Sequence, residues 1–105
     1  MERGEIRWVM FKPPDKRRPV LILTRQELIP HLSDVVVAPL TTTIRQTKSH
    51  VIIDAADGLA VTSAIKLDNL VSVQRQNVGA RICTLSDEQM EHVNRAIEYA
   101  LGTRE

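Results

Sequence analysis

Positively charged side chains gather in a short stretch near the start of the chain. Four of them fall within seven residues, directly ahead of an apolar run: Lys12, Lys16, Arg17 and Arg18. Lysine and arginine contact phosphate oxygens, and an arginine held at the start of a strand can compensate the charge of a pentacoordinate phosphorane. The stretch therefore predicts a phosphate-binding edge. Two alternatives stay open: a solvated charged loop, and a pairing of Arg18 with Asp54 or Asp68.

A second polar cluster is the hydroxyl triplet Thr41, Thr42 and Thr43. The triplet ends the most β-prone segment of the chain, residues 35–43, in which Pro39 interrupts the pattern. Hydroxyls at the end of a strand can donate hydrogen bonds to phosphate oxygens. Threonine is also a common strand residue, so strand formation alone is an alternative explanation of the triplet.

Other kinds of chemistry have little support in the sequence. The three histidines, His31, His50 and His92, have no catalytic or metal-binding motif around them, so we expect ordinary surface side chains. All four glycines are isolated, which argues against a glycine-rich phosphate loop. The single cysteine, Cys83, lies in an apolar segment and is expected to be packed. We expect no metal site and no cofactor.

Short strands are predicted for most of the chain, because apolar and β-branched residues alternate or cluster between turn residues. In the first strand, residues 5–11, we expect Ile6, Trp8 and Met10 to face the core. Pro39 is expected at a bulge or a strand edge, because proline has no N–H to donate to a ladder. The other strands are expected at residues 18–24, 35–43, 51–53, 63–67, 70–73 and 80–85, with residues 12–17 as a connecting loop.

The C-terminal segment predicts one long helix. Ser86 and Gln89 have the spacing of a capping box, and Gly102 is suited to end the helix. Between them an apolar stripe recurs at helical spacing: Met90, Val93, Ile97 and Leu101. Strands this short and numerous usually curl, so we expect a mainly β fold with α, a small barrel closed by a C-terminal amphipathic helix.

Length and charge limit the classes of protein to which the chain can belong. At 105 residues and 11.8 kDa the chain fits one domain, residues 1–105. Its longest apolar run, residues 35–40, is too short to cross a membrane, and its first residues do not resemble a signal peptide, so we expect a cytoplasmic protein. Residues 1–48 have nine Lys/Arg and five Asp/Glu, net +4, whereas residues 49–105 have five and eight, net −3. The basic half is suited to an anionic partner.

Several blocks of the sequence match a known family in order and spacing. The main blocks are residues 4–8, 17–23 and 36–42, which have the sequences GEIRW, RRPVLIL and VVAPLTT. Gly58-Leu59, residues 63–69 and the helix start at residues 85–88 follow in the same order. In these blocks the chain resembles the MazF/PemK toxins, which are sequence-specific messenger-RNA interferases of bacterial toxin–antitoxin systems.

The resemblance implies a fold, an activity and partners. The fold would be a small Src-homology-3-like barrel of the PemK/CcdB type, assembled as a homodimer whose interface groove takes single-stranded RNA. The activity would be a metal-independent endoribonuclease, in which the ribose 2′-hydroxyl attacks its own phosphate and leaves a 2′,3′-cyclic phosphate and a 5′-hydroxyl. The expected protein partner is a cognate antitoxin with an acidic, disordered tail.

The resemblance also assigns roles to individual residues. The catalytic arginine of the family falls on Arg18 and its catalytic threonine on Thr41. A guanidinium is a poor proton shuttle, so we assign charge stabilisation to Arg18, and acid–base work only as the resemblance implies it. Thr41 is assigned a hydrogen bond to a non-bridging phosphate oxygen. RNA contacts are expected from Lys12, Lys16, Arg17, Thr42, Thr43, Arg45, Ser63, Asp68 and Asn69.

The chain departs from the family pattern in one loop, and two functions other than the nuclease stay open. Many relatives have a longer loop ahead of the arginine, so base contacts from that loop do not transfer to residues 12–17 of this chain. A non-catalytic toxin of the same barrel, resembling the CcdB gyrase poisons, would bind a protein target. A plain RNA-binding module is the third possibility. The Arg-Pro-Val block and the threonine triplet favour the nuclease, because a protein-binding toxin needs neither.

Overall fold

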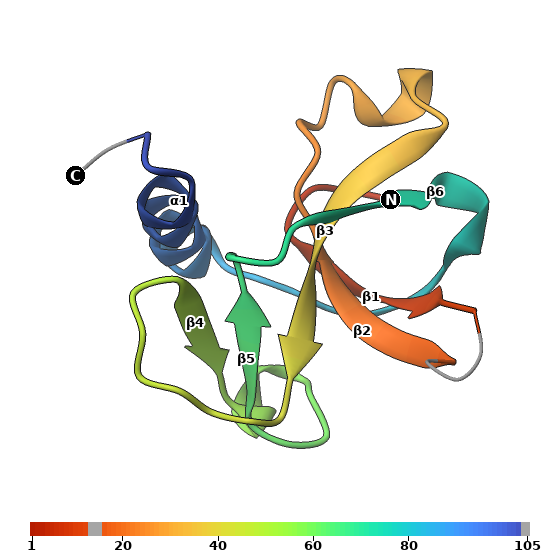
Figure 1. The fold of residues 1–105 in the computed structure, drawn as a ribbon. Coiled ribbons are helices and arrows are strands. Elements are labelled where there is room, and N and C mark those ends of the chain that lie inside the picture. Colours follow the sequence, from red (N-terminus) through yellow and green to blue (C-terminus); the bar gives the residue numbers. More distant parts are fainter. Residues whose placement is uncertain (13–15, 104–105) are drawn as a thin grey trace.

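The computed structural model describes residues 1–12 and 16–103. Within these residues, seven antiparallel strands curve into a half-barrel, and one helix follows them near the C-terminus (Figure 1). The strands are β1 (Glu5–Met10), β2 (Arg17–Ile22), β3 (Asp34–Thr41), β4 (His50–Ile53), β5 (Ser63–Lys66), β6 (Val71–Gln74) and β7 (Val78–Thr84), and the helix is α1 (Asp87–Leu101). The mainly β fold with a C-terminal helix is confirmed. Residues 13–15 of the predicted first loop lie outside the described residues.

Strand β3 is the central strand and joins the two parts of the sheet (Figure 1). Along one edge, residues 37–39 pair with β2. Along the other edge, residues 34–37 pair with β6 and residues 40–41 pair with β5. Pro39 lies where this second edge changes partner, a position that tolerates a residue without an N–H. The predicted interruption at Pro39 is therefore a change of partner within a central strand.

The predicted buried face of β1 is wrong for Trp8 and Met10. Ile6 and Val9 are buried, whereas Met10 is 55% exposed and Trp8 is half-buried. The pairing of β1 with β7 shifts in register between Ile6 and Arg7 and again between Arg7 and Val9. Irregularities of this kind change which side chains of a strand point inward. Strict alternation along the sequence therefore fails in this strand.

Strands β2 and β3 are covered on both faces. Leu21 and Ala38 belong to a core that includes Val93 of α1. Their neighbours Val20 and Val37 belong to a second core on the opposite face. Successive residues of a strand point to opposite faces, so two cores require a continuous apolar run in each strand.

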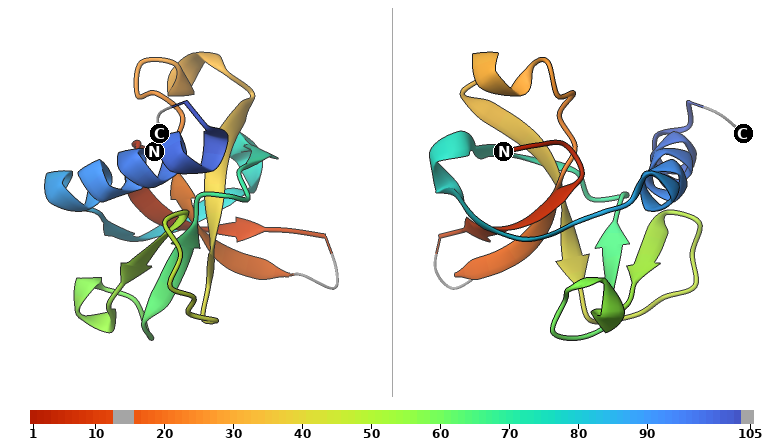
Figure 2. Two further views of the ribbon diagram at one scale, coloured as in Figure 1. Left: turned by 60° about the vertical axis from the view of Figure 1, so that its left-hand side comes forward. Right: turned by 180° about the vertical axis from the view of Figure 1, so that it is seen from behind.

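Helix α1 begins and ends where the sequence predicts. Ser86 Oγ accepts a hydrogen bond from the Gln89 N–H, Gln89 Oε1 accepts one from the Ser86 N–H, and Gly102 ends the helix at a φ of 72°. Val93 is buried, but Leu101 is 59% exposed, so the apolar stripe stops before the last turn. Figure 2 shows α1 next to β4, on the opposite side of the molecule from the end of β1 and the start of β2.

Candidate active site

Arg18 and Thr41 line the same surface cleft, which has a volume of about 340 Å³. The residues that line it are Phe11, Arg18, Pro39, Leu40, Thr41, Lys66, Asn69 and Val71. Two cations, a hydroxyl and an amide thus face an apolar wall. This combination suits a phosphate group with part of a nucleotide beside it.

The pairing of β2 with β3 explains why these two residues meet. Val20 is opposite Pro39 in the antiparallel register. Arg18 lies two residues before Val20, at the start of β2, and Thr41 lies two residues after Pro39, at the end of β3, so both reach the same end of the antiparallel pair. Lys66 comes from the end of β5, whose residue Ile65 is opposite Leu40. The cleft is therefore fixed by backbone pairing on both sides of β3.

The Thr41 hydroxyl is oriented by the chain that follows it. The Thr43 N–H donates a hydrogen bond of 3.1 Å to Thr41 Oγ1. This bond uses a lone pair of Oγ1, so the hydroxyl hydrogen is left to be donated. Thr41 is only partly exposed and can act as a donor toward an anion in the cleft.

Arg17 is placed differently from Arg18. Its guanidinium lies over the Trp8 ring, 4.2 Å from the ring centroid. Adjacent residues in a strand point to opposite faces, so Arg17 is on the other face of the hairpin from the cleft. The stack also accounts for the half-buried position of Trp8, which we predicted for the core.

The structure places the other expected RNA contacts less uniformly. Lys12, after β1, and Lys16, before β2, are exposed, and Thr42 and Thr43 are exposed after β3. Ser63 is only 6% exposed, and its hydroxyl donates to the Val61 carbonyl at 3.2 Å.

A second pocket, of about 580 Å³, adjoins the cleft and shares Lys66 and Asn69 with it. It is lined by Arg45, Thr47, His50, Lys66, Asp68 and Asn69. Of these side chains the sequence pointed to Arg45, Asp68 and Asn69, and it missed Thr47, His50 and Lys66. Phe11 of the cleft was missed as well. We refer to this second pocket as the Asp68 pocket.

The expectation of a surface side chain is wrong for His50. Its side chain is 5% exposed, and its Nε2 lies 3.4 Å from Asp68 Oδ2. His50 is opposite Lys66 in the β4–β5 ladder, which brings it beside the turn that contains Asp68. Pairing between strands buries this imidazole, and no short motif around His50 could have signalled it.

The Asp68 carboxylate is held as an anion. The hydrogen bond from Ser49 lowers the pKa of Asp68, and the nearby His50 and Lys66 act in the same direction against a smaller opposing effect of burial.

Burial raises the pKa of the Cys83 thiol, which packs against the core as predicted. In residues 1–12 and 16–103, no three His, Cys, Asp or Glu side chains are arranged to hold a metal ion.

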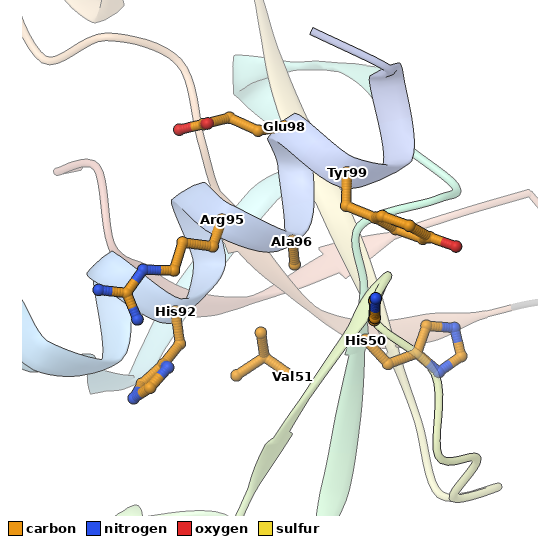
Figure 3. Close-up of a pocket in the computed structure, with 8 residues that line it drawn as sticks. His50, Val51, His92, Arg95, Ala96, Glu98 and Tyr99 are labelled. Carbon is orange, nitrogen blue, oxygen red and sulfur yellow. The ribbon is translucent and has the colours of Figure 1, made fainter. Parts of the chain in front are cut away.

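A third groove, of about 430 Å³, runs between α1 and β4 (Figure 3). Tyr99 and His50 lie on one side of it, and His92 and Arg95 extend from the helix on the other side. Lys48 Nζ lies 5.7 Å from the centroid of the Tyr99 ring. His50 borders both this groove and the Asp68 pocket, so the two are neighbours.

No helix among the described residues has the length and apolar character to span a membrane.

The chain matches one known protein family over nearly its whole length. Residues 2–101 match the family described as PemK-like, MazF-like toxin of type II toxin-antitoxin system. The chain is 42% identical over 86 residues to a protein named Endoribonuclease MazF3 from Mycobacterium tuberculosis (strain CDC 1551 / Oshkosh). That alignment covers 82% of this chain and 84% of the relative.

Two solved structures are similar over nearly their whole length. The Mycobacterium tuberculosis toxin MazF-mt6 superposes with a TM-score of 0.85 at 38% identity, covering 93% of this chain and 96% of the toxin. An endoribonuclease in complex with its cognate antitoxin, from a mycobacterial species, superposes with a TM-score of 0.88 at 25% identity. That match covers 100% of this chain and 98% of the other.

Proposed function

Because the chain belongs to the PemK-like, MazF-like toxin family of type II toxin–antitoxin systems, we propose that it is an endoribonuclease toxin. It cleaves single-stranded RNA in the cleft that lies at the start of β2 and the ends of β3 and β5, at sites chosen by base sequence. The observation that carries this proposal is that Arg18 and Thr41, which lie far apart in the sequence, line one cleft. A toxin that only binds another protein needs neither side chain at that place.

The proposed reaction is an internal transesterification. The 2′-oxygen of the ribose forms a bond to phosphorus, and the bond from phosphorus to the 5′-oxygen breaks. A proton leaves the 2′-hydroxyl, and a proton is taken up by the departing 5′-oxygen. The products are a 2′,3′-cyclic phosphate and a 5′-hydroxyl, so atoms and charge balance without a metal ion.

Each side chain of the cleft has a place in this reaction. The Arg18 guanidinium, which stays protonated at neutral pH, compensates the second negative charge that the phosphorane gains. The Thr41 hydroxyl donates to a non-bridging oxygen, in the orientation set by the Thr43 N–H. Lys66, at the border of the cleft, adds a second positive charge near the phosphate.

The proposal includes two protein partners. We infer a homodimer, in which a second copy of the chain completes the groove for RNA, and a cognate antitoxin that neutralises the toxin. The antitoxin complex of one similar structure and the net +4 charge of residues 1–48 support an acidic antitoxin segment along the basic surface. Since the substrate is cellular RNA, the proposed site of action is the cytoplasm.

The test is cleavage of a long single-stranded RNA by the purified protein in EDTA, followed by mapping of the cut ends. We expect cuts at a short motif that leave 5′-hydroxyl ends. Arg18→Ala should lower the rate about 100- to 1,000-fold, and Arg18→Lys should recover only part of it, because an ammonium lacks the two-pronged contact of a guanidinium.

Arg25→Ala is the matched control for the loss of one arginine. Arg25 is exposed and pairs only loosely with Glu27, at 3.6 Å. It should cleave like the unchanged protein. Full activity of Arg18→Ala, or cleavage that stops in EDTA, would contradict the proposed chemistry. Absence of any cleavage by the unchanged protein would favour a binding role.

A further inference from the structure

The Asp68 pocket is built around a carboxylate that the protein holds in place. Ser49 Oγ donates to Asp68 Oδ2 at 2.8 Å, and His50 Nε2 lies 3.4 Å from the same oxygen. Ser49 and the His50 side chain are both nearly buried, whereas the Asp68 side chain is 44% exposed. The carboxylate is therefore anchored from inside the protein and keeps an open side toward the pocket.

A chain of contacts fixes the two anchoring residues themselves. The Leu67 N–H donates to the Ser49 carbonyl at 3.0 Å, and the hydroxyls of Thr47 and Ser49 lie 3.2 Å apart. His50 is opposite Lys66 in the β4–β5 ladder. The start of β4 and the turn after β5 thus form one unit, in which Asp68 cannot move without breaking buried contacts.

The surroundings of His50 favour one form of its ring. Among the described residues, His50 Nδ1 is the buried side-chain nitrogen or oxygen that lacks a hydrogen-bond partner. A hydrogen on Nδ1 would bury an unpaired donor, which is costly. With its hydrogen on Nε2, the ring directs an N–H group toward Asp68 Oδ2, 3.4 Å away, and leaves only an unpaired acceptor at Nδ1. His50 thus holds an N–H group beside the carboxylate.

An anionic carboxylate discriminates among bases by hydrogen-bond type. It can only accept, so it pairs with the amino groups of cytosine, adenine or guanine. Uracil has no amino group. Its pairing edge has a single N–H, at N3, between two carbonyl oxygens, and these oxygens repel a carboxylate that is fixed at the place of an amino group's partner. A fixed acceptor rejects such a base more strongly than a mobile one, because the mismatch cannot be relieved by rotation.

We propose that the Asp68 pocket selects a base next to the cleaved phosphate, with Asp68 accepting from an amino-bearing base and His50 as the positioning residue. The pocket shares Lys66 and Asn69 with the cleft, which brings a neighbouring nucleotide within reach. Arg45 and Lys66 border the pocket and would contact the phosphates of the bound nucleotide. The inference rests on the proposed endoribonuclease activity and adds the class of base that the site accepts.

The experiment uses a pool of RNAs that contain a random segment, and sequencing of the cut ends gives the base preference at each position. For the unchanged protein we expect one position near the cut at which uracil is disfavoured about 10- to 100-fold. Asp68→Asn adds an amide donor and should raise the share of uracil at that position about tenfold or more. Preferences at the other positions should stay the same.

His50 is tested by a pair of substitutions. His50→Leu removes the donor to Asp68 and should weaken the preference at the same position. His50→Gln places an amide N–H near the former Nε2 and should restore most of it. Recovery of a base preference by glutamine distinguishes positioning of Asp68 from a general structural role. His31→Leu, a change in an exposed histidine of a distant 3₁₀ turn, is the matched control and should leave all preferences unchanged.

Ser49→Ala keeps the proposal testable if His50→Leu fails to fold, because it removes the other anchor of the same carboxylate. Thermal melting of each variant separates loss of fold from loss of selection. Unchanged preferences in Asp68→Asn, or a uniform fall in rate without a change in preference, would overturn the role of the pocket alone. If the unchanged protein cuts no RNA, the proposed function fails, and the role of the pocket fails with it.

Discussion

The cleft that Arg18 and Thr41 line shares Lys66 and Asn69 with the Asp68 pocket, but the chain assembles the two sites in different ways. In the cleft, Arg18 and Thr41 stand at the ends of two paired strands and meet through backbone register alone. In the pocket, Asp68 is held by two nearly buried side chains, Ser49 and His50, from the start of another strand. The cleft presents charge on a frame of strands, whereas the pocket presents an acceptor fixed by a side-chain network.

This difference corresponds to the two tasks that an RNA-cutting enzyme performs. The phosphate is the same in every nucleotide, so side chains that stabilise it need charge and reach but carry no sequence information. A base is recognised by the direction of its hydrogen bonds, which demands an acceptor or donor that cannot rotate away. The comparison therefore predicts that substitutions in the cleft change the rate at all sites, whereas substitutions in the pocket change the choice of site.

Thr41→Val is expected to have the largest of the remaining effects. Valine has the shape of threonine but no hydroxyl, so the change removes one hydrogen bond to the phosphate and little else. We expect the single-turnover rate of cleavage to fall about tenfold, the equivalent of about 1.4 kcal/mol in the transition state. The fall should be equal at every cut site in a mixed RNA pool. A change in the preferred sites would contradict the division between cleft and pocket.

Lys66→Gln addresses the border between the two regions and is expected to have a smaller effect. Removing one phosphate contact should weaken RNA binding a few-fold at moderate salt and reduce the salt dependence of binding by about one counterion. The measurement is the affinity for a short RNA with a 2′-deoxy sugar at the cut site, at several salt concentrations. If the slope against salt is unchanged, Lys66 does not contact a phosphate.

The parts of the fold that the sequence predicts are those with local causes. The cap at Ser86 and the end of α1 at Gly102 follow from residues a few positions apart, and both are confirmed. The strand that contains Pro39 was also predictable, but its change of partner was not, because the partners come from distant segments. Likewise, the exposed position of Met10 depends on a register shift against β7, which the sequence of β1 does not contain.

The residues of the candidate site also fall into those that local sequence predicts and those whose environment comes from distant segments. Arg18 and Thr41 could be assigned because their family blocks are contiguous, and the register of β2 and β3 brings them together. His50 looked like an ordinary surface histidine, because its burial depends on Asp68, Ser49 and the β4–β5 ladder. A side chain whose environment is made by a turn 18 positions away along the chain cannot be recognised from its sequence neighbours.

The pH dependence of stability gives the smallest expected effect and tests the pocket without RNA. The hydrogen bond from Ser49 lowers the pKa of Asp68 below its unfolded value, which is about 3.9. The carboxylate therefore stabilises the fold in full above that pH, and this contribution is lost as the pH falls through the folded pKa. Asp68→Asn should lower the melting temperature at pH 7 by a few degrees at most, because the side chain is partly exposed. At pH 3 the difference should shrink, whereas an equal difference at both pH values would mean that Ser49 and His50 do not hold an anion.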